Sequence, residues 1–150
     1  MNSKDNQVRS RFSFPAKLDL DEVDGGFTVT FRDLPEGITQ GENVENALIE
    51  AADCLEEAIA NRIVNRLEIP IPSELRENEH IVTTPLQTSF KGSIWLAMQE
   101  KNMNQNQFAK ILSVDEKEVR RILDPIHNTK LETLERALIA LGKRPLLYVA

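Results

Sequence analysis

The sequence predicts an α+β protein, with a small N-terminal antiparallel sheet covered by one long helix and an all-helical domain behind it. Three observations predict this class. Apolar and polar residues alternate in two segments before residue 32, which is the period of a half-buried strand. Apolar residues then recur every three or four positions from Val44, and a series of short, capped helix patterns follows Ser89.

Composition indicates a soluble, cytoplasmic chain. No apolar run approaches the roughly 18 residues that a membrane-spanning helix needs, and the polar N-terminus does not resemble a signal peptide. The only cysteine, Cys54, excludes an intramolecular disulfide, and the isolated His80 and His127 do not have the spacing of a zinc site. We expect no metal, no cofactor and no membrane contact.

Charge is distributed unevenly along the chain. The total is −6, but residues 1–88 carry 8 Lys/Arg against 17 Asp/Glu (net −9), whereas residues 89–150 carry 10 against 7 (net +3). An acidic front half suits a basic protein partner. A weakly basic back half suits phosphates.

The front half begins with a predicted hairpin. Strand-like alternation over 12–20 and 27–31 flanks Asp24-Gly25-Gly26, whose glycines supply the positive φ of a tight turn. Residues 34–37 contain a proline and interrupt the pairing, and Ile38-Thr39 is a candidate third strand. The apolar strand positions are Phe12, Phe14, Ala16, Leu18, Leu20, Phe27, Val29 and Phe31.

A long helix follows, capped by Asn43 and with Glu45 near the positive end of its dipole. Its apolar stripe should cover the hairpin, with Cys54 half-buried beside it. The stripe comprises Val44, Leu48, Ala51, Leu55, Ile59 and Ile63. Residues 66–72 alternate but hold two prolines, which predicts an edge strand, and after a loop residues 81–84 predict another short strand.

Four aspartates of the front half resemble a carboxylate cluster for a metal. These are Asp19, Asp21, Asp24 and Asp33, but alternation sends Asp19 and Asp21 to the solvent face, and Asp24 serves the turn. The chain also lacks a glycine-rich phosphate loop and a nucleophile motif. We therefore expect no catalytic residues.

The back half predicts four helices. Ser89 caps the first, which runs to about Lys101, and the capping box Asn104–Gln107 opens the second. Ser113-Val114 makes a turn, and a second box, Asp115 with Glu118, opens the third helix, which Pro125 ends. A last helix over 130–141 carries a stripe formed by Leu131, Leu134, Leu138 and Leu141, and Gly142 follows its end. Two short helices joined by a short turn predict a helix-turn-helix.

These residues resemble the lambda-repressor-like, or Xre-type, helix-turn-helix family. The match lies in Gln105, Phe108-Ala109, Leu112-Ser113-Val114, Val119 and Ile122, with Ser113 where the family usually has glycine. The resemblance implies that the helix after the turn enters the major groove of double-stranded operator DNA. Arginine favours guanine, Glu116 is suited to cytosine, and Lys117 and Gln105 are suited to phosphates. The expected DNA-binding residues are Gln105, Glu116, Lys117, Arg120, Arg121, Asn128, Thr129 and Lys130.

The chain ends in an apolar, strand-like run over 144–150 that has no obvious partner in a helical domain. We predict that Pro145, Leu146, Leu147, Tyr148 and Val149 pair with a second copy of the chain. The resulting homodimer, or a higher assembly, would read palindromic half-sites.

The phrase FRDLPEGITQGE (residues 31–42), with the helix after it, resembles the HicB family of antitoxins. The resemblance implies a degenerate ribonuclease-H-like domain over 12–72 that blocks a small, basic, RNA-cleaving HicA toxin. It further implies a domain over 89–150 that represses the operon. We expect residues 1–11 to be a flexible tail and 73–88 to be a linker with a short strand. The toxin contacts within 12–72 are not identified. Two alternatives remain, namely a repressor that senses a small molecule and has no toxin partner, and a nuclease that retains ribonuclease-H chemistry.

Overall fold

The structure is a computed structural model that describes residues 10–149. These residues form a four-stranded antiparallel sheet and five helices, which confirms the α+β class. Their contacts divide the chain into two compact units. The sheet unit comprises residues 10–58 and 69–84, and the helical unit comprises 59–68 and 85–149. The expected tail over 1–11 lies almost wholly outside the described residues.

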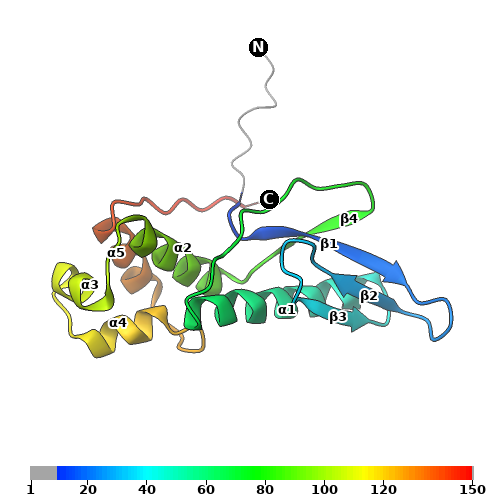
Figure 1. The fold of residues 1–150 in the computed structure, drawn as a ribbon, viewed down its shortest axis with the longest axis horizontal. Helices are drawn as coiled ribbons and strands as arrows, with labels where there is room; N and C mark the ends of the chain where they lie inside the picture. Colours follow the sequence, from blue (N-terminus) through cyan, green and yellow to red (C-terminus); the bar gives the residue numbers. More distant parts are fainter. Residues whose placement is uncertain (1–9, 150) are drawn as a thin grey trace, which may run out of the picture. The chain divides into compact units, whose positions relative to one another are not determined.

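The sheet has the strand order β3-β2-β1-β4 (Figure 1). The strands are β1 (Ser13–Leu20), β2 (Phe27–Thr30), β3 (Ile38–Gly41) and β4 (Glu79–Thr83). The predicted hairpin and third strand are confirmed, with Leu20 opposite Phe27 and Thr30 opposite Ile38. The sheet therefore pairs three strands in sequence order and receives a fourth from far along the chain.

The hairpin loop over 21–26 differs from the expected tight turn. Asp21, and not Asp24, organises it, because its carboxylate accepts hydrogen bonds from the backbone N–H groups of Val23 (2.9 Å) and Asp24 (3.1 Å). These backbone bonds lower the pKa of Asp21. Gly25 and Gly26 have φ values of 74° and 80°, which agrees with the positive φ expected of these two glycines.

Helix α1 (Val44–Val64) begins as predicted, because the Asn43 side chain accepts a hydrogen bond from the Asn46 N–H at 2.8 Å. Its first half lies along one face of the sheet (Figure 1). Ala47 approaches β3 so closely that a Cβ on Gly41 would lie 2.4 Å from its Cα atom. Val44, expected in the apolar stripe, is instead 42% exposed, and Ala47 takes its place against the sheet.

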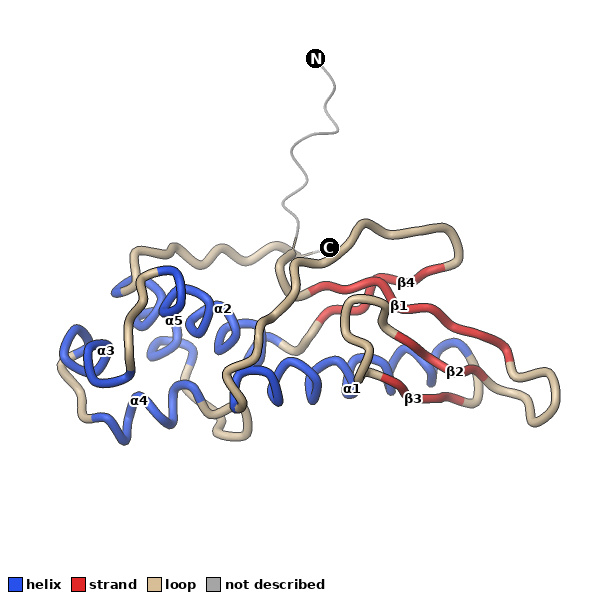
Figure 2. Tube along the Cα trace, in the orientation of Figure 1, coloured by secondary structure: helices blue, strands red, loops and turns tan. Residues whose placement is uncertain are grey.

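The edge strand expected over 66–72 is not formed, and Figure 2 shows this segment as a loop. Its prolines cannot donate to a strand, and the carbonyls of Ile69 and Pro70 accept hydrogen bonds from the Arg11 guanidinium. Strand β4 occupies the edge instead, with Val82 opposite Phe14. The short strand expected within 73–88 is therefore formed, and it belongs to the sheet.

The helical unit contains the four helices that the sequence predicted. They are α2 (Leu86–Glu100), α3 (Gln105–Leu112), α4 (Glu116–Leu123) and α5 (Leu131–Ala140). Helix α2 starts before the expected cap, because Pro85 is its N-cap residue and the Ser89 hydroxyl donates to the Pro85 carbonyl within the first turn. Leu131, expected in the last stripe, is 60% exposed. The core joins Ile94, Ala97, Met98, Phe108, Ala109, Val119, Ile122, Leu123, Leu134, Ala137, Leu138 and Leu141.

Candidate functional site

The turn between α3 and α4 has a defined geometry. The expected capping box opens α3, with Asn104 and Gln107 each accepting from the other's backbone N–H. Helix α3 ends at Ser113, which adopts the left-handed conformation (φ 56°, ψ 42°), and the Val114 N–H then returns to the Ala109 carbonyl at 3.0 Å. A left-handed position favours glycine, so the backbone explains why glycine is common here in the family that the sequence resembles.

The start of α4 is only partly as expected. Asp115 is its N-cap and accepts from the Glu118 N–H at 2.8 Å. The Glu118 carboxylate does not complete a second capping box and lies instead 3.5 Å from the Arg121 guanidinium. Asp115 alone therefore caps this helix through its side chain.

Helix α4 has a buried face and an exposed face. Val119, Ile122 and Leu123 pack into the core of the helical unit. The four residues expected to lie nearest the bases are all exposed, namely Glu116, Lys117, Arg120 and Arg121. Of the remaining expected contacts outside α4, Asn128 and Lys130 are exposed and Gln105 is half-buried. The structure thus leaves these side chains accessible to a ligand.

Thr129 is the exception among the expected DNA-binding residues. It is 6% exposed, and its backbone N–H donates to Gln87 Oε1 (3.2 Å) while its carbonyl accepts from Gln87 Nε2 (2.6 Å). Its hydroxyl lies 2.8 Å from Lys91 Nζ. Because these groups are buried and already bonded inside the protein, Thr129 is not accessible as a DNA contact.

Sequence reasoning missed Lys91, which is fully buried at 0% exposure. Burial lowers its pKa to about 8, an effect that the Asp124 carboxylate partly opposes. The signal was present in the sequence, because Lys91 stands three residues before Ile94 and thus falls on the predicted apolar stripe of its helix. A lysine at such a position is rarely buried without specific partners.

The C-terminal run expected to pair between copies is a loop in the single chain (Figure 2). Leu146, Leu147, Tyr148 and Val149 are 75–86% exposed. Large apolar side chains exposed next to one another are unusual on a monomeric protein.

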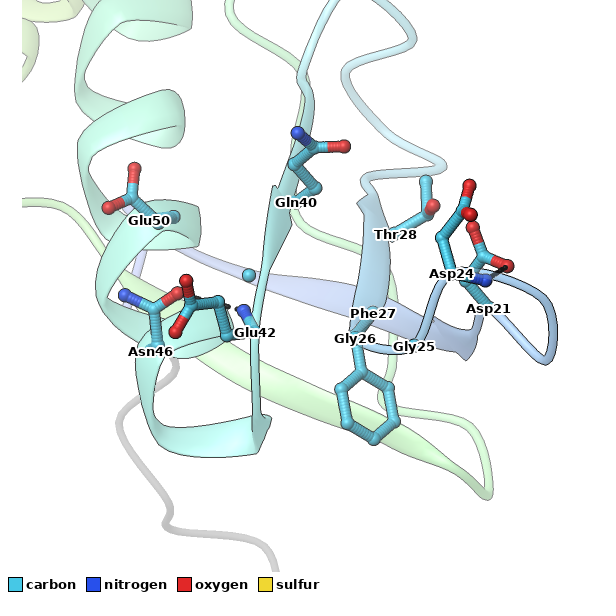
Figure 3. A pocket seen from close by; sticks show the side chains of 11 residues that line it. Asp21, Asp24, Gly25, Gly26, Phe27, Thr28, Gln40, Glu42, Asn46 and Glu50 are labelled. Carbon is cyan, nitrogen blue, oxygen red and sulfur yellow. Dashed lines mark hydrogen bonds between the residues drawn. The ribbon is translucent and has the colours of Figure 1, made fainter.

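The sheet unit contains an acidic pocket of about 640 Å³ (Figure 3). The hairpin loop contributes Asp21 and Asp24, and the segment from the end of β3 into α1 contributes Glu42 and Glu50. Asn46 fixes the chain between them, because its side-chain oxygen accepts from the Glu42 N–H at 2.9 Å. Residues 10–58 and 69–84 together hold 4 Lys/Arg against 15 Asp/Glu, so the pocket lies in a strongly negative unit.

The aspartates weighed as metal ligands have other neighbours. Asp19 pairs with Lys17 (3.2 Å), and Asp33 accepts from the Ser73 N–H (2.9 Å). Within residues 10–149, no three His, Cys, Asp or Glu side chains are grouped to hold a metal ion. Burial, with the nearby Glu57 and Glu36 carboxylates, raises the pKa of the Cys54 thiol, which disfavours the reactive thiolate.

The chain thus joins an acidic sheet unit to a helical unit whose helix α4 exposes Glu116, Lys117, Arg120 and Arg121. A family model of HicB-like antitoxins of bacterial toxin–antitoxin systems matches residues 13–93. This chain belongs to that family. It is therefore an antitoxin of a toxin–antitoxin system. None of the helices formed by the described residues is long and apolar enough to cross a membrane.

Curated relatives extend the similarity through the helical unit. The antitoxin HicB of Escherichia coli (strain K12) is 32% identical over 120 residues, which cover 80% of this chain and 87% of that protein. Antitoxin HicB 2 of Photorhabdus laumondii is 35% identical over 87% of this chain and 91% of its own. The antitoxin HicB of Pseudomonas fluorescens is 30% identical over 95% of this chain and 98% of its own.

Proposed function

We propose that this antitoxin binds and neutralises a HicA-type, mRNA-cleaving toxin and represses its own operon by binding operator DNA. The observation that carries the proposal is the segregation of charge between the two units. The sheet unit holds a large excess of carboxylates, and the helical unit presents Lys117, Arg120 and Arg121 on the exposed face of α4. Each unit therefore suits one of the two partners that such an operon requires.

The toxin partner is assigned to the sheet unit, which we take to be the degenerate ribonuclease-H-like domain. An enzyme that cleaves RNA needs cationic groups to hold phosphates, and a carboxylate-lined pocket complements them. The pocket carboxylates that have no role in holding the loop or the helix start are the best candidates, namely Asp24, Glu42 and Glu50. A small-molecule sensor would need an apolar pocket with a few converging polar groups, and this pocket has a different lining.

Co-expression tests the toxin assignment. The small open reading frame next to this gene should arrest growth when expressed alone, and this chain should restore growth. The double variant Asp24→Lys/Glu50→Lys should slow association with the purified toxin about 10- to 100-fold, because it reverses charge at the pocket. Glu132→Lys/Glu135→Lys on α5 makes the same charge change elsewhere and should leave toxin binding unchanged. RNA cleavage by this chain with magnesium, lost in Asp19→Asn or Asp33→Asn, would instead favour the nuclease alternative.

The DNA partner is assigned to α3, the Ser113 turn and α4, which we propose form an Xre-like helix-turn-helix. Three features support the assignment: the two short helices, the left-handed residue that ends the first, and the exposed polar face of the second. Arg120 and Arg121 are suited to guanine, and Lys117, Gln105, Asn128 and Lys130 to phosphates. Glu116 remains the candidate for selecting cytosine.

Alanine substitution tests the DNA assignment. Arg120→Ala and Arg121→Ala should each weaken binding to the DNA upstream of this operon by about 1 to 3 kcal/mol, because each removes a base contact. Arg136→Ala, at an exposed position of α5, is the matched control and should bind like the wild type. Unchanged affinity in both α4 variants would contradict the assignment.

The second copy of the chain is assigned to the C-terminal run. Because two-fold symmetry is how such domains read paired half-sites, pairing of Pro145, Leu146, Leu147, Tyr148 and Val149 across two chains would both bury this run and build the DNA reader. Deletion of residues 144–150 should give monomers in sedimentation and weak operator binding. A dimer that survives the deletion would locate the interface elsewhere.

A further inference from the structure

Lys91 makes a saturated set of hydrogen bonds inside the helical unit. Its Nζ donates to the carbonyls of Arg121 and Ile122, both at 3.0 Å, and to the Thr129 hydroxyl at 2.8 Å. An ammonium group has three hydrogens to donate, so each of them has an acceptor. The Lys91 ammonium is therefore fully hydrogen-bonded, although it is buried.

The first two acceptors belong to the last turn of α4. Carbonyls at a helix C-terminus lack the usual partner four residues on, and they form the negative end of the helix dipole. The Arg121 carbonyl also accepts from the Asp124 N–H at 3.2 Å. The α4 helix has only eight residues, so its own hydrogen bonds do little to hold its direction. A cation fixed on α2 therefore anchors α4 at the end opposite its Asp115 cap.

The third acceptor lies in the segment that leads into α5. Gln87 lies one helical turn before Lys91, and its side-chain amide bonds the backbone N–H and the backbone carbonyl of Thr129. Two side chains of α2 thus hold Thr129 through three hydrogen bonds. The neighbouring Asn128 and Lys130, which are the expected phosphate contacts of this segment, flank the residue that is held.

We propose that Lys91 is a positioning residue for operator recognition, fixing the direction of α4 and of the Asn128–Lys130 segment relative to α2. This inference rests on the proposed DNA-binding function. Arg121 makes the connection directly, because its carbonyl is bonded to Lys91 while its side chain is exposed. An apolar residue of similar length would fill the same space but would set no direction, since hydrogen bonds are directional and packing is not.

The substitution Lys91→Met in the full-length chain tests the proposal. Affinity for a duplex from the DNA upstream of this operon should fall about tenfold, whereas affinity for a scrambled duplex should change less than about twofold. The slope of log affinity against log salt concentration should stay the same, because Lys91 contacts no phosphate. Lys101→Met, which neutralises an exposed lysine at the end of the same helix, is the matched control and should retain the operator preference.

Thr129→Val provides a second variant, because it removes the hydroxyl that accepts from Lys91, together with that hydroxyl's contact with His127 Nδ1 at 3.3 Å, and keeps the shape of the side chain. It should lose about threefold in operator affinity, again without loss on the scrambled duplex. If Lys91→Met is unfolded, as judged by the fluorescence of Trp95, the threefold loss in Thr129→Val decides the question.

Three results would overturn the inference. One is operator affinity that is unchanged in folded Lys91→Met, or in Thr129→Val if that variant carries the test. Another is an equal loss on both duplexes, which would indicate a role in packing alone. If the wild-type chain does not prefer the upstream duplex, the proposed DNA-binding function itself fails, and the inference fails with it.

Discussion

The two units hold their charged groups differently. The sheet unit has an exposed ion pair between Lys17 and Asp19 at 3.2 Å, and many of its carboxylates are exposed. In the helical unit one cation, Lys91, is wholly buried. Under the proposed functions, surface charge would contact the partners directly, whereas the buried charge of Lys91 would hold α4 and the segment before α5 in place.

The largest difference between the units should appear at alkaline pH. The pKa of Lys91 is lowered from 10.5 to about 8 in the folded chain, so the unfolded state binds more protons between these values. The free energy of unfolding of the helical unit should therefore rise with pH in this window, by up to about 3 kcal/mol. Lys91→Met should abolish the rise. Trp95, the single tryptophan, reports the unfolding of this unit.

The cap of α4 should give a smaller effect, confined to the helical unit. Asp115→Ala removes the side chain that accepts from the Glu118 N–H and should cost about 1 kcal/mol of stability. Glu118→Ala should cost less, because its carboxylate does not complete a capping box. Thermal unfolding followed by Trp95 fluorescence distinguishes them, and equal losses would show that the box forms in solution.

A substitution at the turn residue Ser113 should increase the stability of the helical unit. Ser113 has a φ of 56°, so Ser113→Gly should relieve strain and stabilise the helical unit by about 0.5 to 1 kcal/mol. Ser113→Val should destabilise it, because a β-branched residue is least tolerated there. Denaturant unfolding measures both. Stabilisation by valine would mean that the turn is not left-handed.

The smallest effect should occur at acid pH in the sheet unit. The Arg32 hydrogen bond lowers the pKa of Glu79, so the stability from this pair is present above the ordinary pKa of 4.5 and is lost as pH falls. Glu79→Gln should make the acid unfolding of the sheet unit slightly shallower. Hydrogen exchange of the β1 and β4 amides measures it. An unchanged acid profile would show that the ion pair adds nothing.

The helical unit was the more predictable from sequence, because its signals are local. The Asn104 capping box, the Ser113 turn and the Asp115 cap each depend on residues within five positions. The hairpin of the sheet unit was predictable for the same reason. Strand β4 was predicted as a strand but its pairing with β1 was not, since Val82 and Phe14 meet across a long stretch of chain.

The incorrect predictions involve long-range contacts that the pattern of apolar and polar residues in the sequence does not reveal. Residues 66–72 alternate like a strand, but their carbonyls bond the Arg11 side chain instead. Thr129 resembles a surface threonine until Lys91 and Gln87 are placed against it. The acidic pocket was missed because its carboxylates come from two separate segments, and only the net charge pointed to the sheet unit.

The central claim is that the two units have separate partners within one chain. The direct test measures toxin affinity and operator affinity for two full-length variants, Asp24→Lys/Glu50→Lys and Arg120→Ala/Arg121→Ala. The account predicts that the first associates with the toxin about 10- to 100-fold more slowly and keeps operator binding, and that the second keeps toxin binding and binds the operator more weakly. Loss of both affinities in either variant, in a chain that remains folded, would contradict it.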